Sequence, residues 1–234
     1  MTKPLLIYGL TLGLLNVGIP RAAAQTPFVN LNFELGPIRP PTQPAFFLPI
    51  SSAMPGWTGY INGQVVDTVW YNNISLGSSA LALHGPGWFV PAPQGRYWAM
   101  VQPASSPLDD PPGTAFLGQT GTVPTDAMSI TFIQIYNLPM TLSFHSQDIP
   151  LYLLGTFEAH NQVYFIQGGD VSRFAGQTGE LLFGGGRGDG GAFDDVRFST
   201  EMVPEPSGIA VIGLFAVLGA MAWRRVSTPP PLRL

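Results

Sequence analysis

Glycine and proline interrupt this chain so often that they largely decide its fold class. The 234 residues include 28 glycines and 24 prolines. Between residues 28 and 198, no segment keeps a helical period for a useful length. The stretches between the interruptions alternate apolar and polar residues, as half-buried strands do. The pattern predicts an all-β fold, a β-sandwich built around one sizeable core.

Several local signals support this prediction. Asn62-Gly63 lies between apolar pairs and predicts a hairpin with a type I′ turn. Asp170 is placed to cap a single helical turn, and Gly176 suits its end. Strands are expected at residues 28–34, 65–71, 79–83, 97–102, 114–117, 128–132, 141–144, 151–154, 162–165, 180–183 and 192–198.

Both ends of the chain carry targeting patterns. Lys3, an apolar stretch over residues 5–19 and Ala22-Ala23-Ala24 predict a signal peptide over residues 1–24, with an uncleaved anchor as the alternative. An exported β domain over residues 25–202 follows. The uncharged run 207–223 is at the short end of what a transmembrane helix needs, so it predicts a thin span. Arg224-Arg225 after it places the short tail, residues 226–234, in the cytoplasm.

The C-terminal block, residues 203–225, resembles a known sorting signal. Pro204-Glu205-Pro206, the apolar helix and the Arg224-Arg225 pair together resemble the bacterial PEP-CTERM domain. The resemblance implies a surface protein processed by an exosortase-type membrane enzyme. It would be anchored in the cell envelope or released to the surface or matrix after cutting. The tail is longer than is usual for the family, and an ordinary C-terminal membrane anchor is the alternative.

Charge and cysteine content restrict the partners and the chemistry of the exported part. All 14 acidic residues lie between Glu34 and Glu205, with five arginines among them, which leaves a net charge of −9. Such a surface repels polyanions, so we expect no binding to nucleic acid. The chain has no cysteine, so burial alone must stabilise the core.

Scattered motifs in the exported part resemble bacterial jelly-roll domains of the galactose-binding-like type. They are Asn32-Phe33-Glu34, Pro55-Gly56-Trp57, Asp170-Val171-Ser172 and the closing segment 193–198. The resemblance implies that the first and last strands lie side by side. It also implies a structural calcium ion held by Glu34, Asp194 and Asp195. The alternative is that Asp194 accepts backbone N–H groups and Asp195 pairs with Arg197.

Aromatic residues are the best candidates for a binding role. Trp and Tyr rings on loops stack on the C–H faces of sugars. Trp57, Tyr60 and Trp88 lie beside glycine or proline, or close to them, and are the predicted contacts with an extracellular polysaccharide. The alternative is that most of these rings fill the core.

Catalytic patterns are weak. His84, His145 and His160 are isolated, without the spacing of a zinc site. Glu158 and Glu180 are the minimum for a glycosidase, but the sequence does not bring them together. We therefore predict a non-catalytic surface or extracellular-matrix protein that binds polysaccharide. A purely structural matrix protein is the second hypothesis, and a glycan-cleaving enzyme is the third.

Overall fold

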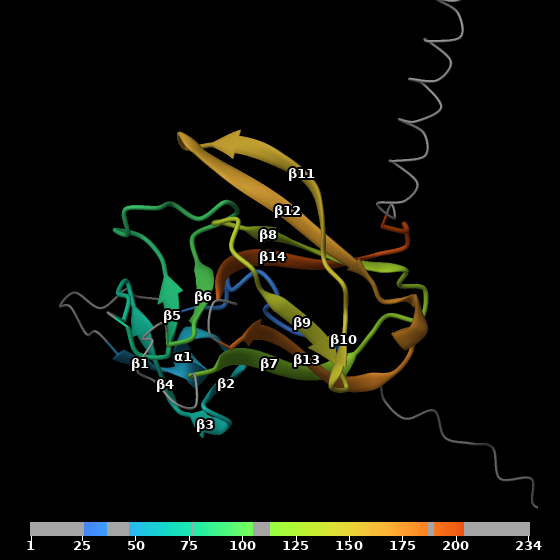
Figure 1. The fold of residues 1–234 in the computed structure, drawn as a ribbon, viewed down its shortest axis with the longest axis horizontal. Helices are drawn as coiled ribbons and strands as arrows, with labels where there is room; N and C mark the ends of the chain where they lie inside the picture. The colour runs from blue at the N-terminus through green and yellow to red at the C-terminus, as the bar shows by residue number, and fades with distance from the viewer. Residues whose placement is uncertain (1–25, 37–46, 76, 105–112, 187–189, 204–234) are drawn as a thin grey trace, which may run out of the picture.

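The computed structural model describes residues 26–36, 47–75, 77–104, 113–186 and 190–203. These residues form two β-sheets with very little helix (Figure 1), which confirms the predicted all-β class and agrees with a sandwich. The predicted signal peptide, transmembrane helix and tail fall outside the described residues. Within that part of the chain, no helix has the length and apolar character needed to cross a membrane.

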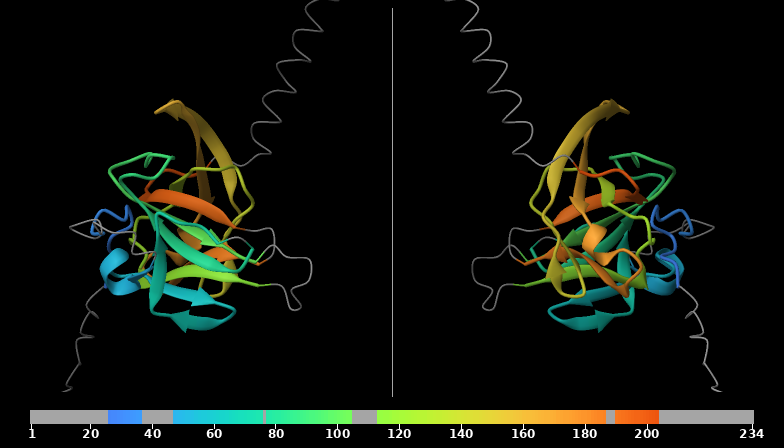
Figure 2. Two further views of the ribbon diagram at one scale, coloured as in Figure 1. Left: turned by 90° about the vertical axis from the view of Figure 1, so that its left-hand side faces the viewer. Right: turned by 90° about the vertical axis from the view of Figure 1, so that its right-hand side faces the viewer.

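The larger sheet has eight strands in the order β1-β4-β5-β6-β14-β8-β12-β11. Its strands are β1 (Phe47–Pro49), β4 (Thr68–Tyr71), β5 (Ala80–His84), β6 (Trp98–Gln102), β8 (Ser129–Gln134), β11 (Tyr152–Ala159), β12 (Gln162–Asp170) and β14 (Gly191–Ser199). β4 and β5 run parallel, and the other neighbours in this sheet are antiparallel. The β11–β12 hairpin extends beyond the rest of the sandwich (Figures 1 and 2).

The smaller sheet is antiparallel, with the order β10-β9-β13-β7-β2-β3. Its strands are β2 (Thr58–Ile61), β3 (Gln64–Val66), β7 (Ala115–Thr122), β9 (Thr141–Phe144), β10 (Gln147–Asp148) and β13 (Thr178–Gly185). A short helix α1 (Ile50–Ala53) and a 3₁₀ turn η1 (Ser172–Phe174) complete the described elements.

The main core contains a cluster of aromatic rings. Phe183 of the smaller sheet stacks on Phe193 of the larger one, with ring centroids 4.5 Å apart. Phe132 packs edge-on against Phe183. Phe33 and Trp57 stack at 5.2 Å, and both rings contact Phe193. Aromatic pairs stabilise a core beyond their buried area, so these rings join the sheets and the N-terminal segment without a disulfide.

The N-terminal segment corrects one prediction. Residues 28–34 form turns instead of a strand, and Asn30 and Phe33 have φ angles of 53° and 58°. The physical reason is that asparagine side chains compete with a strand ladder. The Asn30 amide accepts the N–H of Leu35 (2.9 Å) and donates to the carbonyl of Pro55 (3.1 Å). The segment still lies against the last strand, because Val196 donates its N–H to the carbonyl of Leu31.

Two turn predictions are confirmed. Asn62 and Gly63 have φ angles of 52° and 74° between the paired residues Ile61 and Gln64, as a type I′ hairpin requires. Asp170 accepts the N–H of Ser172 at the start of η1, and Gly176 has a φ of 75°. The predicted strand 65–71 is divided into β3 and β4 at Asp67, whose carbonyl accepts the N–H of Ile50 instead of a sheet partner.

The larger sheet is buried on both faces around β6. Ala99 and Val101 belong to the main core, whereas Trp98 belongs to a second cluster with Val90, Ile135, Tyr164 and Ala192. Successive side chains of a strand point to opposite faces, so the second cluster lies on the outer face of this sheet. The connection between β5 and β6 covers that cluster and forms the site described next.

Candidate functional site: an aromatic pocket

The loop over residues 85–97 is held on the outer face of the larger sheet by hydrogen bonds from its surroundings. Asn72 accepts the N–H of Gly85 (2.8 Å) at the start of the loop. Further along, Trp98 Nε1 donates to the carbonyl of Val90 (3.3 Å), and the Tyr164 hydroxyl donates to that of Pro91 (3.1 Å). The donors come from β6 and β12, so the loop is fixed across the sheet.

Glu34 fixes the other end of the loop. Its Oε1 accepts the backbone N–H groups of Arg96 (2.7 Å) and Tyr97 (3.0 Å). A Cβ added at Gly95, which has a φ of 64°, would lie 2.3 Å from the same oxygen. Glycine is therefore required where the loop passes over this carboxylate.

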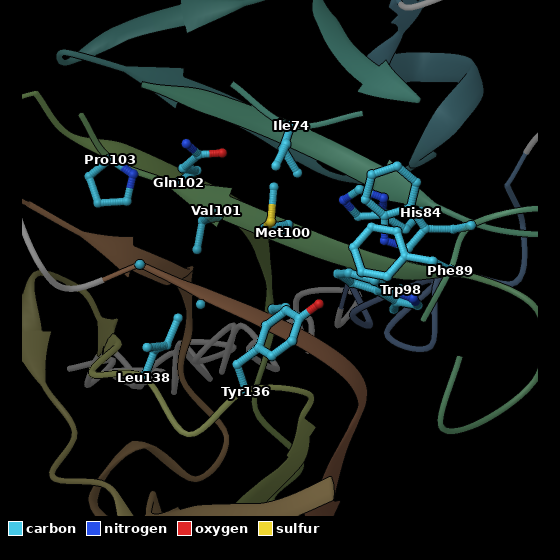
Figure 3. A pocket seen from close by; sticks show the side chains of 14 residues that line it. Ile74, His84, Phe89, Trp98, Met100, Val101, Gln102, Pro103, Tyr136 and Leu138 are labelled. Carbon is cyan, nitrogen blue, oxygen red and sulfur yellow. The ribbon is translucent and has the colours of Figure 1, made fainter. Parts of the chain in front are cut away.

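A pocket of about 420 Å³ lies between this loop and the sheet. That volume falls within the roughly 300–1,000 Å³ typical of small-molecule sites. Figure 3 shows the pocket and the side chains around it. It is lined by Ile74, His84, Trp88, Phe89, Trp98, Met100, Val101, Gln102, Pro103, Tyr136, Leu138, Gly190, Gly191 and Ala192.

His84 lies between two tryptophan rings at one end of the pocket. Its ring stacks on Trp98 with centroids 4.1 Å apart, and it meets the tilted ring of Trp88 at 4.3 Å. Burial lowers the pKa of His84 to about 3. The imidazole is therefore neutral at physiological pH and adds no charge to the pocket.

Polar atoms at this end lack partners. Neither ring nitrogen of the fully buried His84 has a hydrogen-bond partner among the described residues, and the same holds for Trp88 Nε1. Buried polar groups are nearly always satisfied, so these unpaired nitrogens behind the pocket wall are exceptional and distinguish this end of the pocket. Phe89, next in the chain, is 73% exposed and stacks on Trp88 at 4.4 Å. The pocket therefore offers an exposed stacking surface beside buried, unpaired polar groups.

The three predicted sugar contacts lie in different places. Trp88 lines the pocket. Trp57 does not: its ring is 4% exposed in the main core and Nε1 donates to the carbonyl of Asn30, so we withdraw it as a sugar contact. Tyr60 lies on β2 of the other sheet and donates to Glu180 Oε1 (2.6 Å). That hydrogen bond, with burial and the Glu180 charge, raises the pKa of Tyr60 to about 12.

Most of the pocket could not be predicted from the sequence. His84 has no second histidine at metal-ligand spacing, and no local pattern marks Phe89 as a ligand contact. One signal was present: Trp98 and Met100 alternate with Ala99 and Val101, so β6 is apolar on both faces. A strand of this kind must be covered on both sides, and the loop before it is the nearest cover.

The predicted calcium ligands are engaged in other interactions. Asp195 forms an ion pair with Arg197 (2.7 Å), and Asp194 Oδ1 accepts the N–H of Asp195 (2.7 Å), as the alternative expected. Asp194 is fully buried, and its Oδ2 has no partner among the described residues. That part of the chain contains no group of three or more His, Cys, Asp or Glu side chains placed to hold a metal ion. Calcium binding stays a prediction.

The two glutamates considered for catalysis lie on different sheets. Glu158 is exposed on β11 of the larger sheet, whereas Glu180 is on β13 of the smaller sheet and accepts the Tyr60 hydroxyl. His145 Nε2 is 2.7 Å from the carbonyl oxygen of Thr178. The structure therefore does not assemble a carboxylate pair from these two residues.

Comparison with known proteins adds no assignment. No family model, no curated protein and no solved structure matches this chain. The pocket and the targeting patterns of the sequence are therefore the features that indicate its function.

Proposed function

We propose that this chain is an exported, non-catalytic bacterial surface or extracellular-matrix protein that binds a polysaccharide at the aromatic pocket. In this proposal the two sheets are a jelly roll of the galactose-binding-like type. The PEP-CTERM block directs the protein to an exosortase-type enzyme, and calcium serves only the structure. The observation that carries the binding role is the exposed Phe89 ring beside Trp88 and the unpartnered nitrogens of His84.

The chemistry of the pocket suits a sugar ring. A pyranose presents C–H groups on its faces and hydroxyls around its edge. Phe89 and Trp88 offer apolar ring faces. For a ligand that reaches the buried nitrogens, Trp88 Nε1 would supply a donor, and His84 would supply a donor and an acceptor. Few polar groups in a mostly apolar pocket are the usual arrangement for orienting a small ligand.

The competing hypothesis is a structural matrix protein that binds no glycan. Burial of all the tryptophans would favour it. Trp57 and Trp98 are indeed buried, but Trp88 is only partly so and packs against the exposed Phe89 in the pocket lining. This pair favours binding.

The test is a titration of the full-length protein with a panel of neutral and acidic polysaccharides. Phe89→Ala should weaken binding about fivefold or more, because stacking of a sugar face on one aromatic ring is worth on the order of 1 kcal/mol. Phe47→Ala is the matched control, since Phe47 is 54% exposed and lies outside the pocket lining. Absence of affinity for every polysaccharide would leave the structural hypothesis.

A further inference from the structure

The pocket has two chemically different ends. In Figure 3 the aromatic rings of His84, Phe89 and Trp98 gather at one end. Aliphatic side chains dominate the rest of the lining; they are Ile74, Met100, Val101, Pro103 and Leu138. A ligand that fills the pocket must therefore present two kinds of surface.

The aliphatic end offers almost no hydrogen-bond partners. Its one polar side chain, Gln102, is already used: Nε2 donates to the Ser75 carbonyl (2.7 Å) and Oε1 accepts the Ser75 N–H (3.2 Å). The hydroxyl of Tyr136, which also lines the pocket, lies between this end and the aromatic rings (Figure 3). A sugar hydroxyl placed here would lose its bonds to water without replacement, which is unfavourable. A methyl or acetyl group would instead gain from leaving water.

The charge of the pocket lining further restricts the class of ligand. None of the described residues that line the pocket is a lysine, arginine, aspartate or glutamate. An acidic sugar would find no cation there, and the surrounding domain is itself negative overall. The lining therefore favours an uncharged ligand.

We propose that the pocket recognises an uncharged sugar residue that carries an apolar substituent, an acetyl group. The sugar ring stacks at Trp88 and Phe89, and the acetyl group lies at the aliphatic end near Met100 and Leu138. This inference rests on the proposed glycan binding and adds the chemical class of the ligand.

Matched ligands test the substituent. Chitotetraose and cellotetraose differ at C2, where one has an N-acetyl group and the other a hydroxyl. Acetylated glucomannan can be compared with the same material after mild alkaline deacetylation. Calorimetric titration of the full-length protein should give at least about tenfold tighter binding to the acetylated member of at least one pair.

A variant of the aliphatic end completes the test. Leu138 is 52% exposed, so Leu138→Asn should leave the fold intact and reduce the preference for the acetylated ligand. Leu35→Asn, at an exposed leucine outside the pocket lining, is the control and should retain the preference.

The outcomes separate this inference from the proposed function. Equal affinity for both members of each pair, lost in Phe89→Ala, would overturn the acetyl inference and keep glycan binding at the pocket. The same would follow if Leu138→Asn weakened both members equally. Absence of binding to any of the four ligands and to the wider polysaccharide panel would overturn both.

Discussion

Asp194 is buried in an irregular part of β14. The register of the strand shifts between Asp194 and Arg197, and Asp195 has a φ of 53°. Such a β-bulge redirects side chains, and this one leaves Asp194 fully buried and Asp195 beside Arg197. Burial raises the pKa of Asp194 to about 8 from its ordinary 3.8. The carboxyl group is therefore largely neutral in the folded protein near pH 7.

This raised pKa predicts a dependence of stability on pH. Between about pH 4 and pH 8 the folded state keeps a proton at Asp194 that the unfolded chain releases. For this group, the free energy of unfolding is therefore highest below about pH 4, and this stability is lost as the pH rises from about 4 to about 8. We expect Asp194→Asn to raise the free energy of unfolding at pH 8 by at least ~1 kcal/mol, about 2–4 °C in melting temperature, with little change at pH 4.

Thermal melts of both proteins from pH 4 to pH 9 check this expectation. His84 has the opposite effect: its lowered pKa makes the folded state lose stability as the pH falls below about 6.5. This effect is common to both proteins, so it cancels when their melting temperatures are subtracted at each pH. A difference that does not vary with pH would contradict the prediction. The same melts with added calcium or a chelator test the predicted calcium site. Stabilisation of the wild type by calcium at pH 8 that is absent in Asp194→Asn would support the site. No response to calcium or to a chelator would count against it.

Among the elements, the hairpin turns show most clearly how local sequence sets local structure. The β9–β10 turn has His145 and Ser146 with φ angles of 51° and 57°, between the paired residues Phe144 and Gln147. It has the same geometry as the Asn62-Gly63 turn but contains no glycine. A non-glycine residue in this region is strained by about 1–2 kcal/mol.

Ser146→Gly should therefore stabilise the protein by up to ~1 kcal/mol after the added freedom of the unfolded chain is subtracted. Ser52→Gly is the matched control, because Ser52 is exposed in α1, where glycine costs roughly 0.5–1 kcal/mol. Chemical denaturation of the two variants beside the wild type measures both effects. If Ser146→Gly destabilises the protein as much as Ser52→Gly does, the backbone of the β9–β10 turn is not strained at Ser146.

At the scale of the whole molecule, the described sandwich and the two ends with predicted targeting signals have separate roles. The sandwich supplies the pocket, whereas the predicted sorting block would determine the location. If the PEP-CTERM interpretation holds, the mature protein lacks residues 1–24 and the C-terminal helix. Replacing Pro204-Glu205-Pro206 with alanines should leave the C-terminus intact and the protein in the membrane fraction.

Intact mass and cell fractionation measure this outcome. Alanines in place of Pro229-Pro230-Pro231 in the tail provide a matched control, which should be processed like the wild type. A full-length C-terminus in the membrane fraction of the wild type would instead indicate a simple anchored domain and would weaken the matrix hypothesis.

The sequence by itself determined the features that depend on neighbours in the chain. Alternation of apolar and polar residues predicted β8, β9 and β14, and Asn62-Gly63 predicted its hairpin because both residues tolerate positive φ. The alternation pattern failed at residues 28–34. There the side chain of Asn30 forms hydrogen bonds with the backbone of Leu35 and Pro55, and turns form in place of the predicted strand.

Only the tertiary structure decided which aromatic rings are available to a ligand. Trp57 and Trp88 have similar glycine-rich and proline-rich surroundings in the sequence. Trp57 is buried because Phe33 and Phe193 pack against it. Trp88 reaches the pocket because its loop is held by Asn72 at the start, Tyr164 in the middle and Glu34 at the end. These partners are distant in the chain, so no local pattern could assign the two rings their different roles.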